Sequence, residues 1–191
     1  TRQMQITSPK RDIYHNFLYQ QIDLNITITR ALAEAMRGFL PPQCRNRITP
    51  LYYGVAAPNE FINVDRRDAM RAEMGVSTDS FFIGLIGRVK HYKGQHLLVD
   101  AVQRMVNEGA DVCAIIVGNA MEPDYLAQLK QRVTEQGLQQ RILFRDFTDN
   151  VQQLMQACDT VVLTTVEETF GLVLVEAMRA GVAVIGSNRG G

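Results

Sequence analysis

A strand–turn–helix–strand pattern between residues 160 and 185 constrains the fold of this chain more than any other feature. Residues 160–164 are predicted to form a buried strand, and residues 170–179 a helix that is apolar on most sides. After Gly181, residues 182–185 are predicted to form a second strand. The turn of such a unit in a parallel sheet exposes a helix N-terminus to ligands. The pattern therefore predicts a parallel α/β fold and the place of a binding site.

Two glutamates bracket the predicted turn. Glu168 comes just before the helix, and Glu176 lies inside it, eight positions later. A carboxylate in a largely buried helix needs a partner, because burying a bare charge is costly. One interpretation is an i,i+3 ion pair between Glu176 and Arg179 on a solvent-facing strip, which the spacing alone favours. The other is that Glu176 accepts hydrogen bonds from the hydroxyl groups of a ligand.

The start of the predicted helix favours the second interpretation. Phe170, Gly171 and Leu172 are predicted to have free backbone N–H groups, and such groups at a helix start attract an anion. An anion at the helix end, with ligand hydroxyls in reach of the flanking carboxylates, describes a sugar nucleotide. The turn is therefore a candidate site for such a ligand.

A second anion-receptive region follows residues 81–86, a continuous apolar run typical of a central parallel strand. Gly87 and Arg88 stand at its carboxyl end, and Lys93 comes five residues after Arg88. An arginine fork and a lysine ammonium group in this position can hold a diphosphate. A solvated basic loop is the alternative, and it would be favoured if the run stood alone. Two anion-receptive loops at two strand ends of one sheet favour ligand binding.

Strand and helix patterns alternate through the rest of the chain, which predicts a doubly wound parallel sheet. The predicted strands comprise residues 22–28, 48–53, 81–86, 112–117, 141–144, 160–164 and 182–185. The predicted helices comprise residues 30–39, 65–74, 94–107, 123–135, 151–157 and 170–179. Thr29 is expected to cap the first of these helices.

Composition excludes several classes of function. Lys+Arg and Asp+Glu both number 20 in the 191 residues, so the basic excess typical of nucleic-acid binding is missing. Three widely spaced cysteines form no disulfide framework, which fits a reducing compartment. No apolar stretch approaches the ~20 residues of a membrane span. His91 and His96 are five positions apart and His15 is isolated, so no metal site is expected.

Three other enzyme classes lack their motifs. The string GLIGRVKHYKG after the strand at 81–86 is not the G-x-G-x-x-G of a dinucleotide-binding dehydrogenase. A G-x-x-x-x-G-K-[ST] loop is missing as well. Glycosidases hold two carboxylates across a glycosidic bond, whereas Glu168 and Glu176 are expected at the start of one helix and two turns into it.

Two strings resemble the retaining GT-B glycosyltransferases of the large group 1 family. The first, residues 167–191, is EETFGLVLVEAMRAGVAVIGSNRGG, and the family's E-x7-E pair falls on Glu168 and Glu176. The second is GLIGRVKHYKGQHLLVDAV, in which the family's Arg and Lys fall on Arg88 and Lys93. The combined match, with the correct order and spacing, is highly specific. Tyr53 departs from the family pattern, in which Asn is common.

The resemblance implies a role for each matched residue. Arg88 and Lys93 would neutralise the diphosphate and stabilise it as a leaving group, which with Glu168 makes them the expected catalytic residues. Glu168 would contact the donor sugar, and Glu176 would accept hydrogen bonds from the ribose. The base would lie near residues 144–147. The expected donor-binding residues are Gly87, Arg88, Lys93, Phe144, Asp146, Glu168, Phe170, Gly171, Leu172 and Glu176.

The resemblance also implies a domain organisation. Residues 1–46 would be the tail of an N-terminal acceptor domain with its linker. Residues 47–191 would be an incomplete C-terminal donor domain, the Rossmann-like half of a GT-B fold, truncated at its C-terminus. Apolar surface, a sheet edge and the strand at 22–28 would then lie uncovered, which predicts an oligomer or strand exchange.

The implied enzyme transfers a hexose, or a derivative of one, from a UDP- or GDP-sugar to a glycan or lipid-linked acceptor. It would act without a metal, in the cytoplasm or peripherally at the inner membrane face, in polysaccharide biosynthesis. This chain would bind a nucleoside diphosphate but transfer poorly. Two alternatives stay open: a non-catalytic nucleotide-binding or assembly module, and a sugar-nucleotide epimerase, which the E-x7-E string disfavours.

Overall fold

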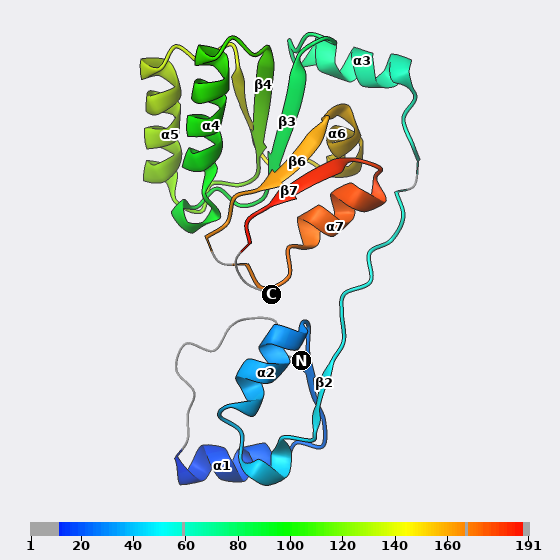
Figure 1. Cartoon of the computed structure of the whole chain (residues 1–191), viewed down its shortest axis with the longest axis vertical. Coiled ribbons are helices and arrows are strands. Elements are labelled where there is room, and N and C mark those ends of the chain that lie inside the picture. Colours follow the sequence, from blue (N-terminus) through cyan, green and yellow to red (C-terminus); the bar gives the residue numbers. More distant parts are fainter. Residues whose placement is uncertain (1–11, 59, 167, 189–191) are drawn as a thin grey trace. The chain divides into compact units, whose positions relative to one another are not determined.

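The computed structural model describes residues 12–58, 60–166 and 168–188, which form two compact units (Figure 1). The small unit contains the described residues up to Gly54 together with residues 168–171. The sheet unit contains the described residues from Val55 to Val166 and from Leu172 to Asn188. Among the described residues, none of the helices combines the length and the apolar character needed to cross a membrane.

The sheet unit is built on five parallel strands (Figure 1). Their spatial order is β5 (Ile142–Arg145), β4 (Val112–Val117), β3 (Phe81–Ile86), β6 (Thr160–Leu163) and β7 (Ala183–Gly186). The order runs away from β3 in both directions, so the crossover connections reverse between β3 and β6. This is the topological switch point of a doubly wound sheet, the place where such folds bind ligands. The predicted α/β fold class is confirmed.

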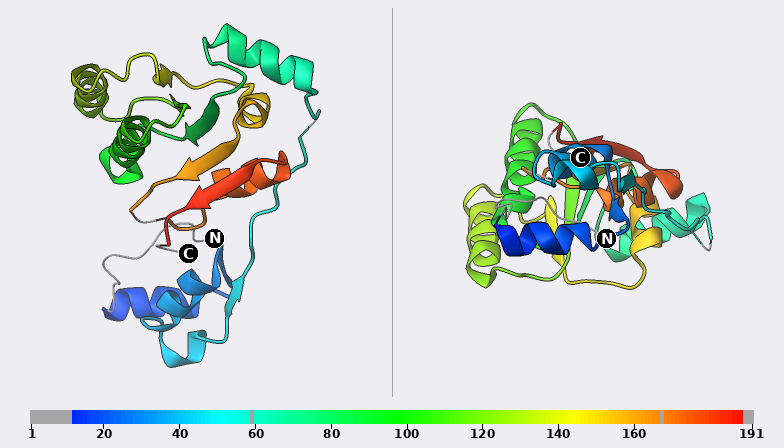
Figure 2. Two further views of the ribbon diagram at one scale, coloured as in Figure 1. Left: turned by 45° about the horizontal axis from the view of Figure 1, so that its top comes forward. Right: turned by 90° about the horizontal axis from the view of Figure 1, so that it is seen from below.

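Helices cover both faces of this sheet (Figures 1 and 2). They are α3 (Val64–Glu73), α4 (Gln95–Asn107), α5 (Pro123–Glu135), α6 (Val151–Ala157) and α7 (Leu172–Arg179), with a 3-10 turn, η2 (His91–Lys93). Helices α4 and α5 pack on one face, while α3, α6 and α7 pack on the other. Proline at its first position starts α5, and Gly137, with φ of +68°, follows its end.

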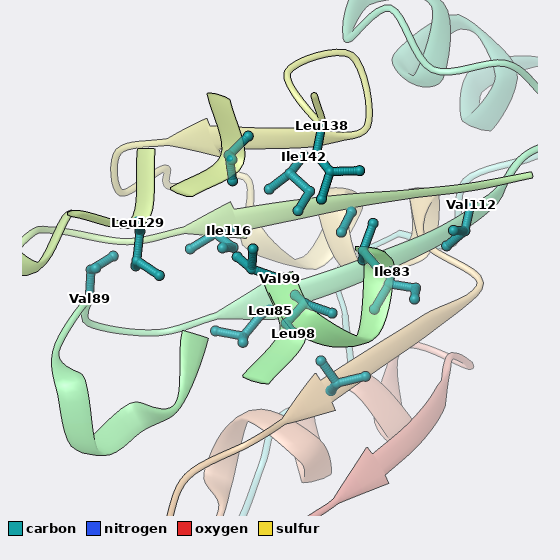
Figure 3. Packing of buried hydrophobic residues seen from close by; sticks show 14 of the residues in the cluster. Ile83, Leu85, Val89, Leu98, Val99, Val112, Ile116, Leu129, Leu138 and Ile142 are labelled. Atoms are coloured by element: carbon teal, nitrogen blue, oxygen red, sulfur yellow. The ribbon is translucent and has the colours of Figure 1, made fainter. Parts of the chain in front are cut away.

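Alternate residues of the central strands fill two separate cores, because successive side chains of a strand point to opposite faces. Ile83 and Leu85 of β3 meet Leu98 and Val99 of α4 on the first face (Figure 3). Phe82, directly before Ile83 in sequence, packs with the α3 and α6 residues on the second face. The strands are thus apolar on both sides, as expected for a buried parallel sheet.

A fully buried guanidinium group lies within the second face of the sheet unit. The Arg71 side chain is 1% exposed. Its Nε donates to the carbonyl of Ala157 at 2.8 Å, and its Nη1 donates to the carbonyls of Thr78 and Ser80 at 3.1 Å each. Nη2 lies 2.8 Å from the carboxylate of Asp159. The charge is therefore paired, and its donors join α3 to the α3–β3 loop and to the connection between α6 and β6.

Asp159 completes this ion network. Its carboxylate also accepts from the Phe82 backbone N–H at 2.7 Å and pairs with Arg67. Burial on its own would raise the pKa of the Asp159 carboxyl. The hydrogen bond from Phe82 and the two guanidinium groups outweigh it, so the net pKa is lowered. The carboxylate is thus held ionised where it anchors α3 to the sheet.

The small unit contains a parallel strand pair, β1 (Asn25–Thr27) and β2 (Ile48–Pro50). Its other elements are α1 (Ile13–Gln20), α2 (Arg30–Arg37) and a 3-10 turn, η1 (Pro42–Cys44). Thr29 caps α2 as predicted, since its hydroxyl accepts from the Leu32 N–H at 3.1 Å. The predicted strand at 22–28 is shorter than expected, and it is not unpaired, because β2 covers one of its edges.

Candidate functional site

The cationic loop begins where β3 ends. Arg88 is exposed there, and its carbonyl accepts a hydrogen bond from Nε2 of the fully buried Gln95 at 3.0 Å. The turn η2 carries Lys93, which is half-buried, and its Nζ lies 5.5 Å from the centroid of the Tyr92 ring. The Arg88 backbone is therefore held by a buried side chain, while the Arg88 side chain reaches solvent.

Hydrogen bonds join the cationic loop to the segment that follows β6; we call them the Thr164 clasp. The Thr164 hydroxyl lies 3.0 Å from the carbonyl oxygen of Lys93 and 2.9 Å from that of Gly94. The Val166 N–H donates to the carbonyl of Tyr92 at 3.1 Å. The loops at the ends of β3 and β6, on either side of the switch point, are thus fastened to each other.

Gly94 permits this close approach. It has φ of +73°, and a Cβ at this position would lie 2.3 Å from the carbonyl oxygen of Thr164. We expect Gly94→Ala to lower the free energy of unfolding by about 2–4 kcal/mol, because left-handed backbone strain and a clash with backbone add. Gly109 has φ of +86° with open space around its Cα, so Gly109→Ala should cost only about 1 kcal/mol. Urea unfolding of both variants checks this, and equal losses would contradict it.

The helix after β6 starts later than predicted. It begins at Leu172 and not at Phe170, because Gly171 has φ of +78°, which a right-handed helix cannot include. The four amides that lack an intrahelical acceptor are therefore those of Gly171, directly before the helix, and of Leu172, Val173 and Leu174. Of the three predicted amides, those of Gly171 and Leu172 belong to this set, and that of Phe170 does not.

The residues before this helix group with the small unit. The Phe170 ring packs against Tyr53 with centroids 5.4 Å apart and an edge-on angle of 87°, and against Tyr52 at 6.3 Å. Glu168 is half-buried, and its carboxylate accepts from the Thr169 N–H at 2.9 Å. Among the predicted site residues, the sheet unit contains Gly87, Arg88, Lys93, Phe144, Asp146, Leu172 and Glu176. The small unit contains Glu168, Phe170 and Gly171. Residues 167 and 189–191 of the glutamate string lie outside the described residues.

Glu176 is a half-buried carboxylate on α7. Burial raises the pKa of its carboxyl group. Within the described part of the chain, no ion pair joins it to Arg179, which is exposed. The i,i+3 pair that spacing alone favoured is therefore missing, and the acid is partly desolvated in the folded protein.

A small pocket opens at the carboxyl ends of β4 and β5. It is lined by Val89, Ile116, Gly118, Leu126, Lys130, Phe144, Arg145 and Asp146. Phe144 is half-buried and Asp146 exposed, and Lys130 on α5 holds its Nζ 5.8 Å from the centroid of the Phe144 ring. Gly118 leaves no side chain at the pocket floor, where a Cβ would meet the carbonyl oxygen of Gly87 at 2.1 Å.

Sequence reasoning missed a histidine pair beside the cationic loop. The rings of His91 and His96 stack with centroids 4.9 Å apart, and His96 Nδ1 lies 3.0 Å from the Tyr125 hydroxyl. Burial and the neighbouring His91 lower the pKa of His96. The left-handed turn at Gly94 folds the two rings together, which their spacing does not indicate. No metal-ligating group of three or more side chains occurs among the residues that the structure describes.

The sequence profile of one family, described as glycosyl transferases group 1, matches residues 66–191. The chain belongs to this family. The mannosyltransferase LpsB of lipopolysaccharide core biosynthesis in Rhizobium meliloti is 36% identical over 128 residues, which is 66% of this chain and 36% of LpsB. This group 1 chain therefore spans much less than the full length of that relative.

Solved structures of glycosyltransferases share its fold. Anabaena HepE in complex with UDP-glucose is 32% identical with a TM-score of 0.81, over 92% of this chain and 48% of HepE. The C-terminal domain of the group 1 protein LpcC from Francisella tularensis is 27% identical with a TM-score of 0.59, over 68% of this chain and 69% of that domain. The sheet unit thus matches the Rossmann-like half of a GT-B architecture.

Proposed function

We propose that this chain binds the sugar nucleotide of a retaining group 1 glycosyltransferase. One observation carries the proposal: the Thr164 clasp joins the loop of Arg88 and Lys93 to the segment that leads into α7. In this proposal the two cations and the start of α7 bind the same ligand at the switch point of the sheet. The HepE structure supports a UDP-sugar as donor, since that relative was solved with UDP-glucose.

Each cation has a defined task in this proposal. Arg88 presents a planar fork and Lys93 a point charge to the donor diphosphate. Bond cleavage to the sugar leaves negative charge on the departing diphosphate, and preorganised cations stabilise that developing charge. The proposal needs no metal ion for this step. Leu172 adds the backbone amide of a helix start, which also favours an anion.

The remaining predicted residues bind the rest of the donor. Glu176 accepts from the ribose hydroxyls, and its partial burial supports this role, because a desolvated carboxylate gains from such donors. Glu168 contacts the sugar, while Phe170 and Gly171 shape the approach to the phosphates. The pocket of Phe144 and Asp146 takes the nucleobase. Its mixture of an aromatic ring and charged side chains fits a flat, polar-edged group.

The proposed whole protein transfers a hexose-type sugar to a glycan or lipid-linked acceptor in the cytoplasm or at the inner membrane face. Residues 1–46 would then close its acceptor domain, and residues 47–191 would form part of its donor domain. The mannosyltransferase LpsB, named for lipopolysaccharide core biosynthesis, supports such an acceptor. If residues 1–46 supply only the end of an acceptor domain, the chain on its own should bind donor and transfer slowly.

Calorimetric titration with UDP, GDP and ADP tests the binding proposal. We expect at least one of them to bind with a Kd between about 10 µM and 1 mM. Folded protein that binds none of the three would contradict the proposal. Incubation of the full-length protein with radiolabelled sugar nucleotides and membrane or glycan acceptors then separates a transferase from a non-catalytic nucleotide-binding module. The anomeric configuration of the product, read by NMR, tests retention.

Glu176→Gln should make the protein more stable and its ligand binding weaker. Burial raises the pKa of Glu176, so its charged form costs stability, and this stability is recovered as the pH falls through the raised folded-state pKa to the pKa of the unfolded chain. At pH 7 we expect the Tm without ligand to rise by about 1–3 °C, and near pH 4 the gain should vanish. The affinity for the bound nucleotide should fall by about 3- to 10-fold.

Thermal unfolding at both pH values and calorimetry check this pair of effects. Glu135→Gln on the exposed side of α5 serves as the matched control and should change neither quantity. A Tm that falls in Glu176→Gln would show that the carboxylate stabilises the fold. Unchanged affinity would remove Glu176 from the ligand site.

A further inference from the structure

We propose that Thr164 is a positioning residue that holds Lys93 in place for the donor diphosphate. This inference rests on the proposed function and deepens it. Its starting observation is that the Thr164 hydroxyl lies 3.0 Å from the carbonyl oxygen of Lys93 and 2.9 Å from that of Gly94. A hydroxyl has one proton, so it donates to one of these carbonyls at a time or is shared between them.

The Thr164 clasp connects the end of β6, which is held in the sheet, to the cationic loop, which lies outside the strands. Thr164 directly follows β6. The residue after the neighbouring strand β7 also binds this end of β6, because the Ser187 N–H donates to the Leu163 carbonyl at 3.0 Å. The Ser187 hydroxyl also donates to the carbonyl of Thr165 at 2.6 Å. The cationic loop consists instead of a short 3-10 turn, His91–Lys93, between a strand and a helix. The β6 end therefore acts as the anchor.

The backbone conformation of Gly94 determines which carbonyls the Thr164 hydroxyl can reach. Its left-handed φ of +73° reverses the chain between Lys93 and α4, and its Cα lies against the Thr164 backbone. A side chain of the same shape without a hydroxyl at position 164 keeps this packing but leaves the Lys93 carbonyl without that donor. The Lys93 backbone can then rotate, and small displacements of a charged group weaken a positioned ionic contact considerably.

The contribution of Thr164 to diphosphate affinity should therefore depend on Lys93. In the full-length protein, we expect Thr164→Val to weaken UDP binding by about 3- to 10-fold, while Thr164→Ser, which keeps the hydroxyl, binds within about 2-fold of the wild type. Where UDP does not bind, GDP or ADP serves as the probe. Binding of uridine, which lacks the diphosphate, should not change in either variant.

Thr160→Val is the matched control for a loss of stability. Thr160 is the first residue of β6, is 3% exposed, and donates from its hydroxyl to the Ala183 carbonyl at 3.1 Å. The two valine variants lose the same kind of hydrogen bond at opposite ends of one strand. We expect both to unfold at somewhat lower temperature, and only Thr164→Val to lose affinity for the diphosphate.

A double-mutant cycle tests the route of the effect. In a Lys93→Ala background, Thr164→Val should cause no further loss of UDP affinity. In an Arg88→Ala background, Thr164→Val should still weaken UDP binding by about 3- to 10-fold. Three results would each overturn the inference alone. They are normal UDP binding by Thr164→Val, an equal loss of UDP affinity in Thr160→Val, and a Thr164→Ser variant that binds UDP as weakly as Thr164→Val. Failure of the wild type to bind any of the three diphosphates would overturn the proposed function as well.

Discussion

Replacing Arg88 or Lys93 by alanine should reduce the affinity for the bound nucleoside diphosphate by about 10- to 100-fold, because each removes a charge-assisted contact. The double variant should show no measurable binding by calorimetry. Arg88 is exposed, so its loss should leave the Tm without ligand unchanged. Affinity in the wild type should also fall as ionic strength rises, since the contacts are ionic.

Arg104→Ala provides the control for the change in net charge. Arg104 lies in the last turn of α4, is 83% exposed, and pairs only with Glu108 among the described partners. Its loss should leave affinity within about 2-fold of the wild type, because surface pairs of this kind contribute little. If Arg104→Ala weakened binding as much as Arg88→Ala, the overall field of the protein would explain the effect, and the proposed diphosphate site would lose its support.

Arg71→Ala should have the largest effect on stability. The substitution removes a guanidinium group that is 1% exposed and leaves Asp159 with one of its two cations. Breaking a buried ion pair from one side costs about 3–5 kcal/mol, because the remaining charge and three backbone carbonyls lose their partner. Guanidinium chloride unfolding, followed by circular dichroism, measures this loss. A loss below about 1 kcal/mol would contradict the assigned role of the network.

Arg67→Ala is the natural comparison, since Arg67 pairs with the same carboxylate but is 30% exposed. We expect it to cost about 1 kcal/mol, near the upper end for accessible pairs. The lowered pKa of Asp159 sets the pH dependence: its contribution is present above the unfolded-state pKa and is lost as the pH falls through the lower folded-state pKa. The difference between Arg71→Ala and the wild type should therefore shrink in acid.

Elements with a regular apolar pattern could be predicted from the sequence. The strands at 81–86 and 112–117 and the helices at 123–135 and 151–157 have the bounds expected for them. The two strands are continuous apolar runs, while the helix at 123–135 has its buried residues Tyr125, Leu129 and Val133 at a helical spacing. Parallel pairing then follows from the alternation of strands and helices. Short or exposed elements were less predictable, and the strand expected at 22–28 has only three paired residues.

The sequence could predict which loops form the candidate site, but it could not predict where each helix begins or which residues contact each other there. The glutamate string suggested a helix from Phe170, yet it begins at Leu172, because the conformation of Gly171 cannot be read from its neighbours. The partners of Thr164 and Arg71 are equally hidden. The two carbonyls beside Thr164, and Ala157 and Asp159 beside Arg71, lie 70 or more positions away in the chain, and no local pattern marks a contact of that length. Burial of Glu176 likewise depends on the packing of α7.

The order of the strands also determines when the ligand site can exist during folding. Strands β3, β4 and β5 follow one another in the chain and lie side by side, so they can assemble from local connections. The clasp instead joins residues 71 positions apart, and it forms only after β6 has docked on the opposite edge of β3. A newly synthesised chain can therefore hold three strands together before the proposed nucleotide site is complete. Binding of the proposed ligand would, in turn, stabilise the docked state of β6 against β3 by mass action.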